Sequence, residues 1–286
     1  MGQPPTVRET MSHRFSCRTF TGEPLGAPQR EQLAAAAAAV VAGPSGCRLR
    51  FRLLAAAPGD EQALKRLGTY GTIRGVAAFL VGAAEAGPRY REDFGYGMER
   101  LVLQATGLGL GTCWVGGTFT RGTFRQRIGA SGTERMPAVT AVGIAPGGAQ
   151  DGLVRRTIQG SRRKPWDALF HDQEIGRPLT ADQAGPWADP LEMVRRAPSA
   201  SNRQPWRIVR RGGHWDFYLR RTPGYPPRLA RILLGVEDLQ RVDMGIAMCH
   251  FELAARENGL PGHWVDRPPP GALPDPLTEY SISWEE

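Results

Sequence analysis

The chain has 286 residues, of which 41% are hydrophobic and 22% are charged, a composition typical of a folded globular protein. Its net charge of +8 suits phosphate-bearing partners, but it has no zinc-finger, basic-zipper or RNA-recognition motif, so we do not expect nucleic-acid binding. Its four cysteines lack metal-ligand spacing, which predicts no metal site and a reducing, cytoplasmic environment.

The N-terminal stretch, residues 1–15, has no apolar segment of the kind that a signal peptide carries. The longest apolar run, residues 33–42, is far shorter than the roughly 20 residues that a membrane-spanning helix needs. We therefore expect no membrane segment. After this run, Pro44 and Ser45 indicate a turn, and residues 49–54 resemble a strand.

Residues 93–114 read as one long, mostly apolar helix that ends at glycine, and Trp114 closes the segment. The sequence GLGLG at residues 107–111 resembles the start of a dinucleotide-binding motif. Such a motif must follow a strand and open a helix, whereas these glycines follow a helix, so we interpret them as its cap.

The stretch APSASNRQPWRIV, residues 197–209, places a turn before a strand that includes Ile208 and Val209. It gathers many side-chain donors and acceptors beside Trp206. This loop either holds a flat polar ligand or is an ordinary turn, and its residues alone do not decide between the two. Trp206 itself is expected in the core.

Two pairs of segments repeat along the chain. Residues 93–114 and 243–264 have equal length, match at several positions and both close on tryptophan, at an offset of 150 residues. Residues 42–54 match the 197–209 region at an offset of 154 to 155, with Phe51-Arg52 aligned on Trp206-Arg207. The same order of elements in both halves predicts a duplicated α+β fold, with apolar central helices packed on each other as in a twofold dimer.

At this point the chain resembles the FMN-dependent nitroreductase superfamily, in the branch where two such folds are fused. The motifs that carry the resemblance are RFSCRTF at 14–20, GLGLGTCWVGG at 107–117, SRRKPWDALF at 161–170 and APSASNRQPWRIV. The resemblance implies two tandem nitroreductase-like folds in an intramolecular pseudo-dimer, a first half at residues 1–172 and a second half at 173–286. It also implies that the chain is a monomer.

In this family FMN lies across the dimer interface, so the resemblance implies a site shared by the two halves. The implied cofactor-binding residues are Arg14, Phe15, Ser16, Arg18, Trp114, Val115, Gly116, Arg162, Arg163, Pro198, Ser199, Ala200, Ser201, Asn202 and Gln204. The arginines suit the flavin phosphate, because a guanidinium binds phosphate through paired hydrogen bonds. Without the resemblance they would read as ordinary surface charge.

The mirrored site is expected to be lost. The first-half loop has Arg48 where the second-half loop has its asparagine, and the second half offers only Arg177 as a phosphate ligand. We therefore expect one FMN per chain. No residue is assigned as catalytic, because a flavin performs its own hydride and electron chemistry.

The resemblance implies an oxidoreductase that passes electrons from NAD(P)H through FMN to a nitro, quinone or related small acceptor. Two alternatives stay open. In the first, the chain holds a lidded flavin without turnover. In the second, it is a specialised flavin-dependent oxidase or dehydrogenase. The sequence does not show whether a substrate channel is open.

Overall fold

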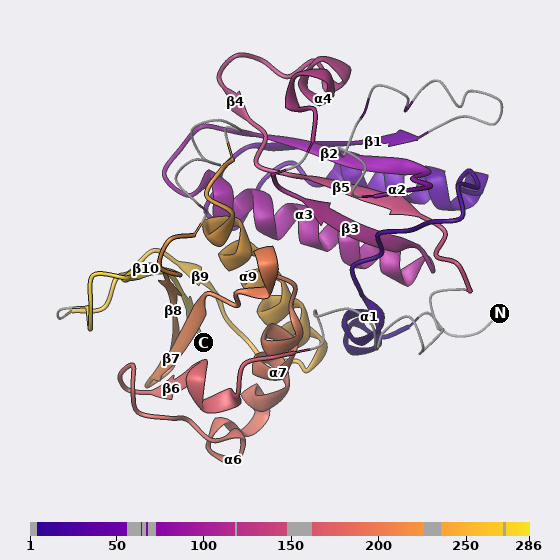
Figure 1. Ribbon diagram of the computed structural model, residues 1–286. Coiled ribbons are helices and arrows are strands. Elements are labelled where there is room, and N and C mark those ends of the chain that lie inside the picture. Colours follow the sequence, from indigo (N-terminus) through magenta and orange to yellow (C-terminus); the bar gives the residue numbers. More distant parts are fainter. Residues whose placement is uncertain are drawn as a thin grey trace.

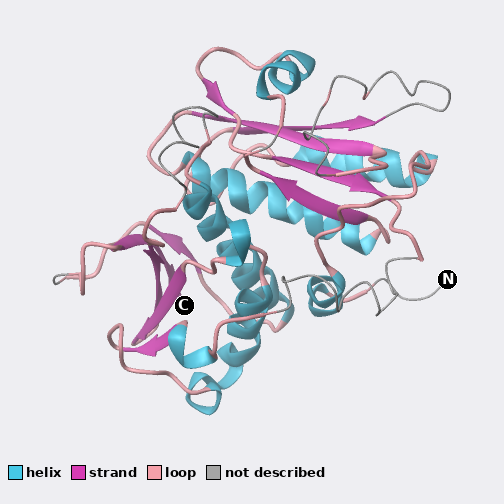
Figure 2. Ribbon diagram, viewed as in Figure 1, coloured by secondary structure: helices cyan, strands magenta, loops and turns pink. Residues whose placement is uncertain are grey.

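The computed structural model describes residues 5–55, 64, 67, 73–117, 119–147, 162–225, 236–270 and 273–286, so Ser161 of the closing motif lies outside it. Figures 1 and 2 show two sheets with helices between them. The helices and 3-10 turns are α1 (Val7–His13), α2 (Ala27–Ala39), α3 (Tyr90–Gly107), α4 (Arg121–Ile128), η2 (Trp166–Ala168), α6 (Ala181–Ala184), η3 (Gly185–Trp187), α7 (Ala188–Arg196), η4 (Ala200–Asn202) and α9 (Leu239–Glu257). The strands are β1 (Leu49–Ala55), β2 (Ala78–Glu85), β3 (Gly111–Val115), β4 (Glu134–Arg135), β5 (Val139–Gly143), β6 (Phe170–Asp172), β7 (Trp206–Arg211), β8 (His214–Arg220), β9 (His263–Val265) and β10 (Thr278–Glu285).

The two sheets repeat one topology. The first has the order β1-β2-β5-β3, and the second contains β7-β8-β10-β9 in the matching places, with antiparallel pairing at every step. In both halves a helix, a Pro-Ser turn, two strands, a long helix and a tryptophan-bearing strand follow in the same order. The structure therefore confirms the tandem α+β fold that the sequence repeat predicts.

One strand breaks the symmetry. β6 pairs in parallel with β7, Phe170 opposite Ile208, at the edge of the second sheet. Within the predicted division at residue 172, β6 belongs to the first half but extends the sheet of the second. No described strand occupies the equivalent edge beside β1. The division itself stays a prediction.

The two long helices cross between the sheets at a pair of glycines (Figure 1). A Cβ atom added to Gly95 would lie 2.1 Å from the carbonyl oxygen of Val242, and one added to Gly245 would lie 1.8 Å from that of Glu92. The 150-residue offset relates residues 92 and 95 to residues 242 and 245, so α3 and α9 present equivalent surfaces to each other. This reciprocal contact is what a twofold dimer interface produces, and here it lies within one chain.

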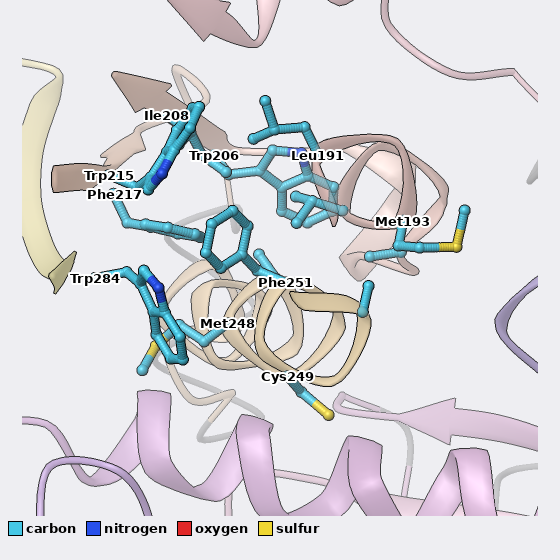
Figure 3. Close-up of a cluster of buried hydrophobic side chains, with 14 of the residues drawn as sticks. Leu191, Met193, Trp206, Ile208, Trp215, Phe217, Met248, Cys249, Phe251 and Trp284 are labelled. Atoms are coloured by element: carbon cyan, nitrogen blue, oxygen red, sulfur yellow. The ribbon is translucent and has the colours of Figure 1, made fainter. Parts of the chain in front are cut away.

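Large apolar side chains fill the space between the second sheet and its helices. Figure 3 shows Trp206, Trp215 and Phe217 from the sheet pointing toward Phe251 of α9. Trp206 is fully buried, which confirms its predicted place in the core. The aromatic rings pack edge-on or tilted for the most part, as in Phe217 on Phe251 at 5.3 Å between ring centroids.

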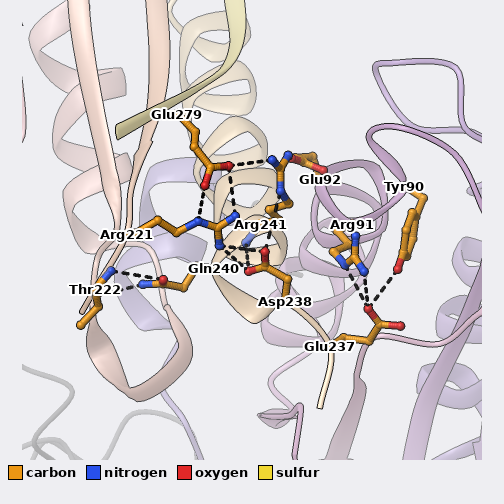
Figure 4. A network of polar contacts seen from close by, with 10 residues as sticks. All are labelled: Tyr90, Arg91, Glu92, Arg221, Thr222, Glu237, Asp238, Gln240, Arg241 and Glu279. Carbon is orange, nitrogen blue, oxygen red and sulfur yellow. Dashed lines mark hydrogen bonds and ion pairs between the residues drawn. The ribbon is translucent and has the colours of Figure 1, made fainter. Parts of the chain in front are cut away.

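A polar network joins the halves near the first turns of α3 and α9 (Figure 4). Arg241 of α9 donates to Glu92 of α3 at 2.8 Å and to Glu279 of β10 at 2.7 Å. Arg221 donates to Glu279 and to Asp238 at the N-cap of α9. Arg241 thus ties α9 both to α3 of the first half and to β10 of the second.

Among the described residues, no helix combines the length and the apolar character that crossing a membrane requires.

Candidate functional site

The loop between α7 and β7 has a strained backbone. Ser201, Asn202 and Gln204 adopt φ angles of +50°, +53° and +48°, which residues other than glycine rarely do. Such strain persists only where surrounding contacts hold it, and it is concentrated at functional sites. This is the loop in which the sequence places most of the implied second-half ligands.

Two side chains hold the loop in this shape. Asp243, on the first turns of α9, accepts a hydrogen bond from the amide of Ala200 at 2.9 Å. Its carboxyl group is buried, and burial raises its pKa well above the ordinary range. Ser199 Oγ accepts from the amide of Gln204 at 2.9 Å, which closes the loop on itself. The loop is therefore fixed to α9.

The closing segment at residues 162–164 runs beside this loop. Arg163 Nη1 donates to Asn202 Oδ1 at 3.0 Å, and Asn202 Nδ2 donates to the carbonyl of Arg162 at 2.8 Å. The side-chain oxygen Oε1 of Gln204 contacts the same segment by accepting a hydrogen bond from the backbone N–H of Lys164 at 2.8 Å. Residues about 40 positions apart, which the resemblance assigns to one cofactor site, therefore lie in direct contact.

Basic side chains gather around Arg163. Burial, together with the nearby charges of Arg14, Arg195 and Arg196, lowers its pKa to about 10, while Glu192 acts in the opposite direction. Arg14 follows α1, and α1 is joined to α7 by a 3.1 Å hydrogen bond from Arg196 to Ser12. Arg14 and Arg163 thus meet at one partly buried place, where a doubly charged phosphate would offset their repulsion.

The opening motif lies along β3. Ser16 forms a parallel bridge with Thr112, and the amide of Cys17 donates to the Thr112 carbonyl at 2.8 Å. Burial raises the pKa of the Cys113 thiol, and the charges of Arg18 and Arg14 oppose that rise. Both arginines therefore lie near β3. Phe15 packs against the apolar cluster on the outer face of the first sheet.

The end of β3 reaches the same helix that anchors the loop. A Cβ on Gly116 would lie 2.5 Å from the Leu239 side chain at the start of α9. Gly116 therefore lies beside Leu239, one helical turn before Asp243, which anchors the loop at 198–204.

A buried pair behind Trp114 was not foreseen from the sequence. Trp114 Nε1 donates to Glu99 Oε2 at 2.8 Å, and Glu99 Oε1 lies 2.9 Å from His250 Nε2. His250 Nδ1 faces the carbonyl of Met193 at 3.0 Å, so this nitrogen must carry a proton. Glu99 and His250 thus form a direct polar contact between α3 and α9. No motif marks them, because the 150-residue repeat pairs neither with a similar residue.

The mirrored location keeps a cavity of about 600 Å³. The first-half loop lines it with Pro44, Ser45, Cys47 and Arg48, and β9 contributes Trp264. Arg48 is 81% exposed and forms a 3.5 Å ion pair with Glu85, so it does not fill the cavity. The thiol of Cys47 has a pKa raised to about 11, mainly by burial.

The mirrored cavity has a mixed set of charges. Arg89, a second basic residue in its lining, forms an ion pair with Asp266, and Arg177 lies elsewhere in an ion pair with Asp172 at 3.7 Å. Around Arg163, by contrast, the basic side chains outnumber the acidic ones. A doubly charged phosphate would therefore meet mostly basic side chains near Arg163 but mixed charges in the mirrored cavity.

All four cysteines are free, and the described residues contain no group of three His, Cys, Asp or Glu side chains that could hold a metal ion.

Comparisons with known proteins agree with this architecture. The family model described as "Putative TM nitroreductase" matches residues 6–255. A solved structure described as a putative nitroreductase from Thermotoga maritima MSB8 is 18% identical, with a TM-score of 0.64, and the match covers 100% of this chain and 95% of that one. No curated protein matches.

Two other nitroreductases match about half of the chain. A nitroreductase family protein from Clostridium difficile 630 is 17% identical over 50% of this chain and 85% of that one, with a TM-score of 0.40. A nitroreductase with bound FMN from Bacteroides fragilis NCTC 9343 is 18% identical over 49% of this chain and 89% of that one, with a TM-score of 0.38.

Proposed function

The chain belongs to the family described as Putative TM nitroreductase, and on this premise we propose that it is an FMN-dependent oxidoreductase. It accepts electrons from NAD(P)H and passes them to a nitro compound, a quinone or a related small acceptor. We propose that it acts as a monomer, because the interface that the family forms between subunits would be internal here. We also propose that it acts in the cytoplasm.

One observation carries the proposal. Arg163 of the closing segment contacts Asn202 of the loop, with Arg14 of the opening motif close enough to lower the pKa of Arg163. Three segments from distant parts of the sequence thus meet, each one that the family resemblance assigns to the flavin. A polar, strained loop beside clustered guanidinium groups fits a flat ring with a phosphate tail.

The proposed binding residues fall into groups with separate tasks. Arg14, Arg18, Arg162 and Arg163 would hold the phosphate, and Ser16 would add a hydroxyl. The residues that would hold the ring and its polar chain are Phe15, Trp114, Val115, Gly116, Pro198, Ser199, Ala200, Ser201, Asn202 and Gln204.

FMN, when bound, supplies the hydride and electron transfer. The task of the chain is to bind and orient it. Asp243 fixes the loop through the amide of Ala200, so the strained backbone need not reorganise when the ring binds. Gln204 is 3% exposed, and it braces the loop against Lys164 and Arg162.

The test separates the proposal from its alternatives. The purified chain is saturated with FMN, desalted, and mixed with NADH or NADPH without oxygen. We expect the yellow colour to bleach and then to return when a nitroaromatic compound or a quinone is added. The Arg163→Ala variant, measured in parallel, should lose its flavin on the column and show no bleaching.

Each contrary result points elsewhere. Retained flavin that neither nucleotide bleaches would make the chain a flavin-holding protein. Bleaching that only oxygen reverses would favour an oxidase. No retained flavin, even after reconstitution with excess FMN, would exclude a flavoprotein.

A further inference from the structure

A second group of basic side chains lies next to the proposed flavin site. Lys164 follows Arg163 directly but contacts different partners. Its Nζ lies 3.3 Å from the carbonyl oxygen of Gln204, and Arg207 Nη1 lies 3.3 Å from the same oxygen. Arg203 and Arg220 are close enough to lower the pKa of Lys164. We call Lys164, Arg203, Arg207 and Arg220 the basic cluster.

The charges of the basic cluster are poorly balanced. In the described part of the chain, Arg220 pairs with Asp275, whereas Lys164, Arg203 and Arg207 form no ion pair. Burial and the neighbouring guanidinium groups lower the pKa of Lys164 to about 8 and that of Arg207 to about 10. Half-buried like charges repel one another, and a bound anion would relieve that repulsion.

An orphaned histidine lies on the same face of the sheet. His171 is 5% exposed, and neither of its ring nitrogens has a hydrogen-bond partner in the described structure. It pairs with Val209 on β7, so it shares the outer face of the sheet with Arg207, while Phe170 and Ile208 face the core. Besides Arg207, the charged group that acts on it is Asp167. A buried ring N–H without a partner is costly, and a ligand oxygen could accept from it.

Among the described residues of the first half, no such cluster lies at the equivalent place. Arg52, the repeat counterpart of Arg207, is exposed on β1. The outer face of the first sheet is covered by α4 and an apolar cluster that includes Phe79, Val81 and Phe124. The basic cluster is therefore a feature of the second half and not a consequence of the shared fold.

We propose that the basic cluster, with His171, binds a phosphate monoester, and that this group is the 2′-phosphate of NADPH. The inference rests on the proposed function and gives it a preferred electron donor. Lys164 and Arg203 are sequence neighbours of Arg163 and of Asn202, which are proposed to hold the flavin. NADPH differs from NADH by this doubly charged group alone, so a basic cluster next to the proposed flavin site would discriminate between them.

The experiment measures binding without turnover. The FMN-loaded protein, in phosphate-free buffer, is titrated with NADP⁺, with NAD⁺ and with inorganic phosphate. We expect NADP⁺ to bind at least tenfold more tightly than NAD⁺. Lys164→Met and Arg207→Met, which keep the apolar stems, should each bring the ratio near one. Arg52→Met is the matched control and should leave the ratio unchanged.

The outcomes separate the sources of phosphate. Equal affinity for both nucleotides together with binding of inorganic phosphate would overturn NADPH as the source but keep a phosphate site. Equal affinity and no phosphate binding would overturn the inference altogether. Should Lys164→Met or Arg207→Met fail to retain FMN, the ratio of NADP⁺ to NAD⁺ affinity is compared between the unaltered protein and Arg203→Met, and that comparison tests the inference.

The result is independent of catalysis. Selective NADP⁺ binding without bleaching of the flavin by NADPH would keep the proposed binding site for the 2′-phosphate and overturn the proposed function. If NADH and NADPH bind equally and bleach the flavin with equal kcat/KM, the proposed function stands and the inference is overturned.

Discussion

Gly245→Ala tests how the two halves pack. A Cβ at this position would lie 1.8 Å from the carbonyl oxygen of Glu92 and 2.6 Å from the amide nitrogen of Tyr96, both backbone atoms of the facing helix. A side chain in the way could rotate aside, but backbone cannot. The helices must therefore separate until the contact reaches ordinary van der Waals distance, which disturbs the buried interface along α3 and α9.

The expected magnitude follows from two opposing terms. Overpacking a core costs about 1–3 kcal/mol, and a backbone clash belongs near the upper limit. Alanine is a better helix former than glycine by about 1 kcal/mol, which offsets part of that cost. We therefore expect Gly245→Ala to lower the free energy of unfolding by about 2 kcal/mol.

Urea unfolding followed by circular dichroism measures this loss as a lower midpoint with an unchanged m-value. Gly122→Ala in α4 is the matched control, because no atom lies within 4 Å of its added Cβ. It should leave stability unchanged or raise it by up to about 1 kcal/mol. If Gly245→Ala proved as stable as this control, the close helix crossing would be wrong.

Three further predictions concern the site and its surroundings. Arg14→Ala should weaken FMN binding by about 1.5–3 kcal/mol, the value of a charge-assisted hydrogen bond, so that the flavin is lost on a desalting column; a colour as strong as that of the parent would contradict the phosphate assignment. Glu99→Leu removes the carboxylate that Trp114 and His250 share and leaves both of their nitrogens without this partner, so it should lower the melting temperature measured by calorimetry, because breaking a buried pair costs several kcal/mol; an unchanged melting temperature would exclude that pair as a structural element. Burial, with a smaller effect of Arg207, lowers the pKa of His171 to about 4 from an ordinary value of 6.5, so its contribution to stability is complete above pH 6.5 and is lost as the pH falls toward 4. His171→Phe should flatten that part of the stability-pH curve in urea titrations, and a curve identical to that of the parent would refute the assignment.

Most of the fold could be predicted from the repeat in the sequence. Residues 93–114 and 243–264 predicted two long helices followed by tryptophan, and α3 and α9 with β3 and β9 confirm them. The pairing of the helices was also predictable, because helices that are apolar on most faces must bury those faces. The path of β6 was not, since a three-residue strand that joins the other half's sheet leaves no periodic signal.

The site was predictable to the extent that it depends on local motifs. The loop at 197–205 and the closing segment were named from the sequence, and the contact between Arg163 and Asn202 joins them. Asp243 is the first residue of the repeated segment 243–264, but its role in fixing the loop depends on how α9 packs. Glu99 and His250 could not be foreseen for the same reason, because a buried pair forms only when two helices meet.

The number of FMN molecules per chain tests the central proposal most directly. The chain is saturated with FMN, desalted and denatured, and the absorbance of the released flavin is compared with the protein concentration. We predict a ratio of one, because basic side chains gather around Arg163 whereas the mirrored cavity has the mixed charges of Arg48, Glu85, Arg89 and Asp266. A ratio near two would contradict the asymmetric site, and a ratio near zero after reconstitution would contradict the flavoprotein itself.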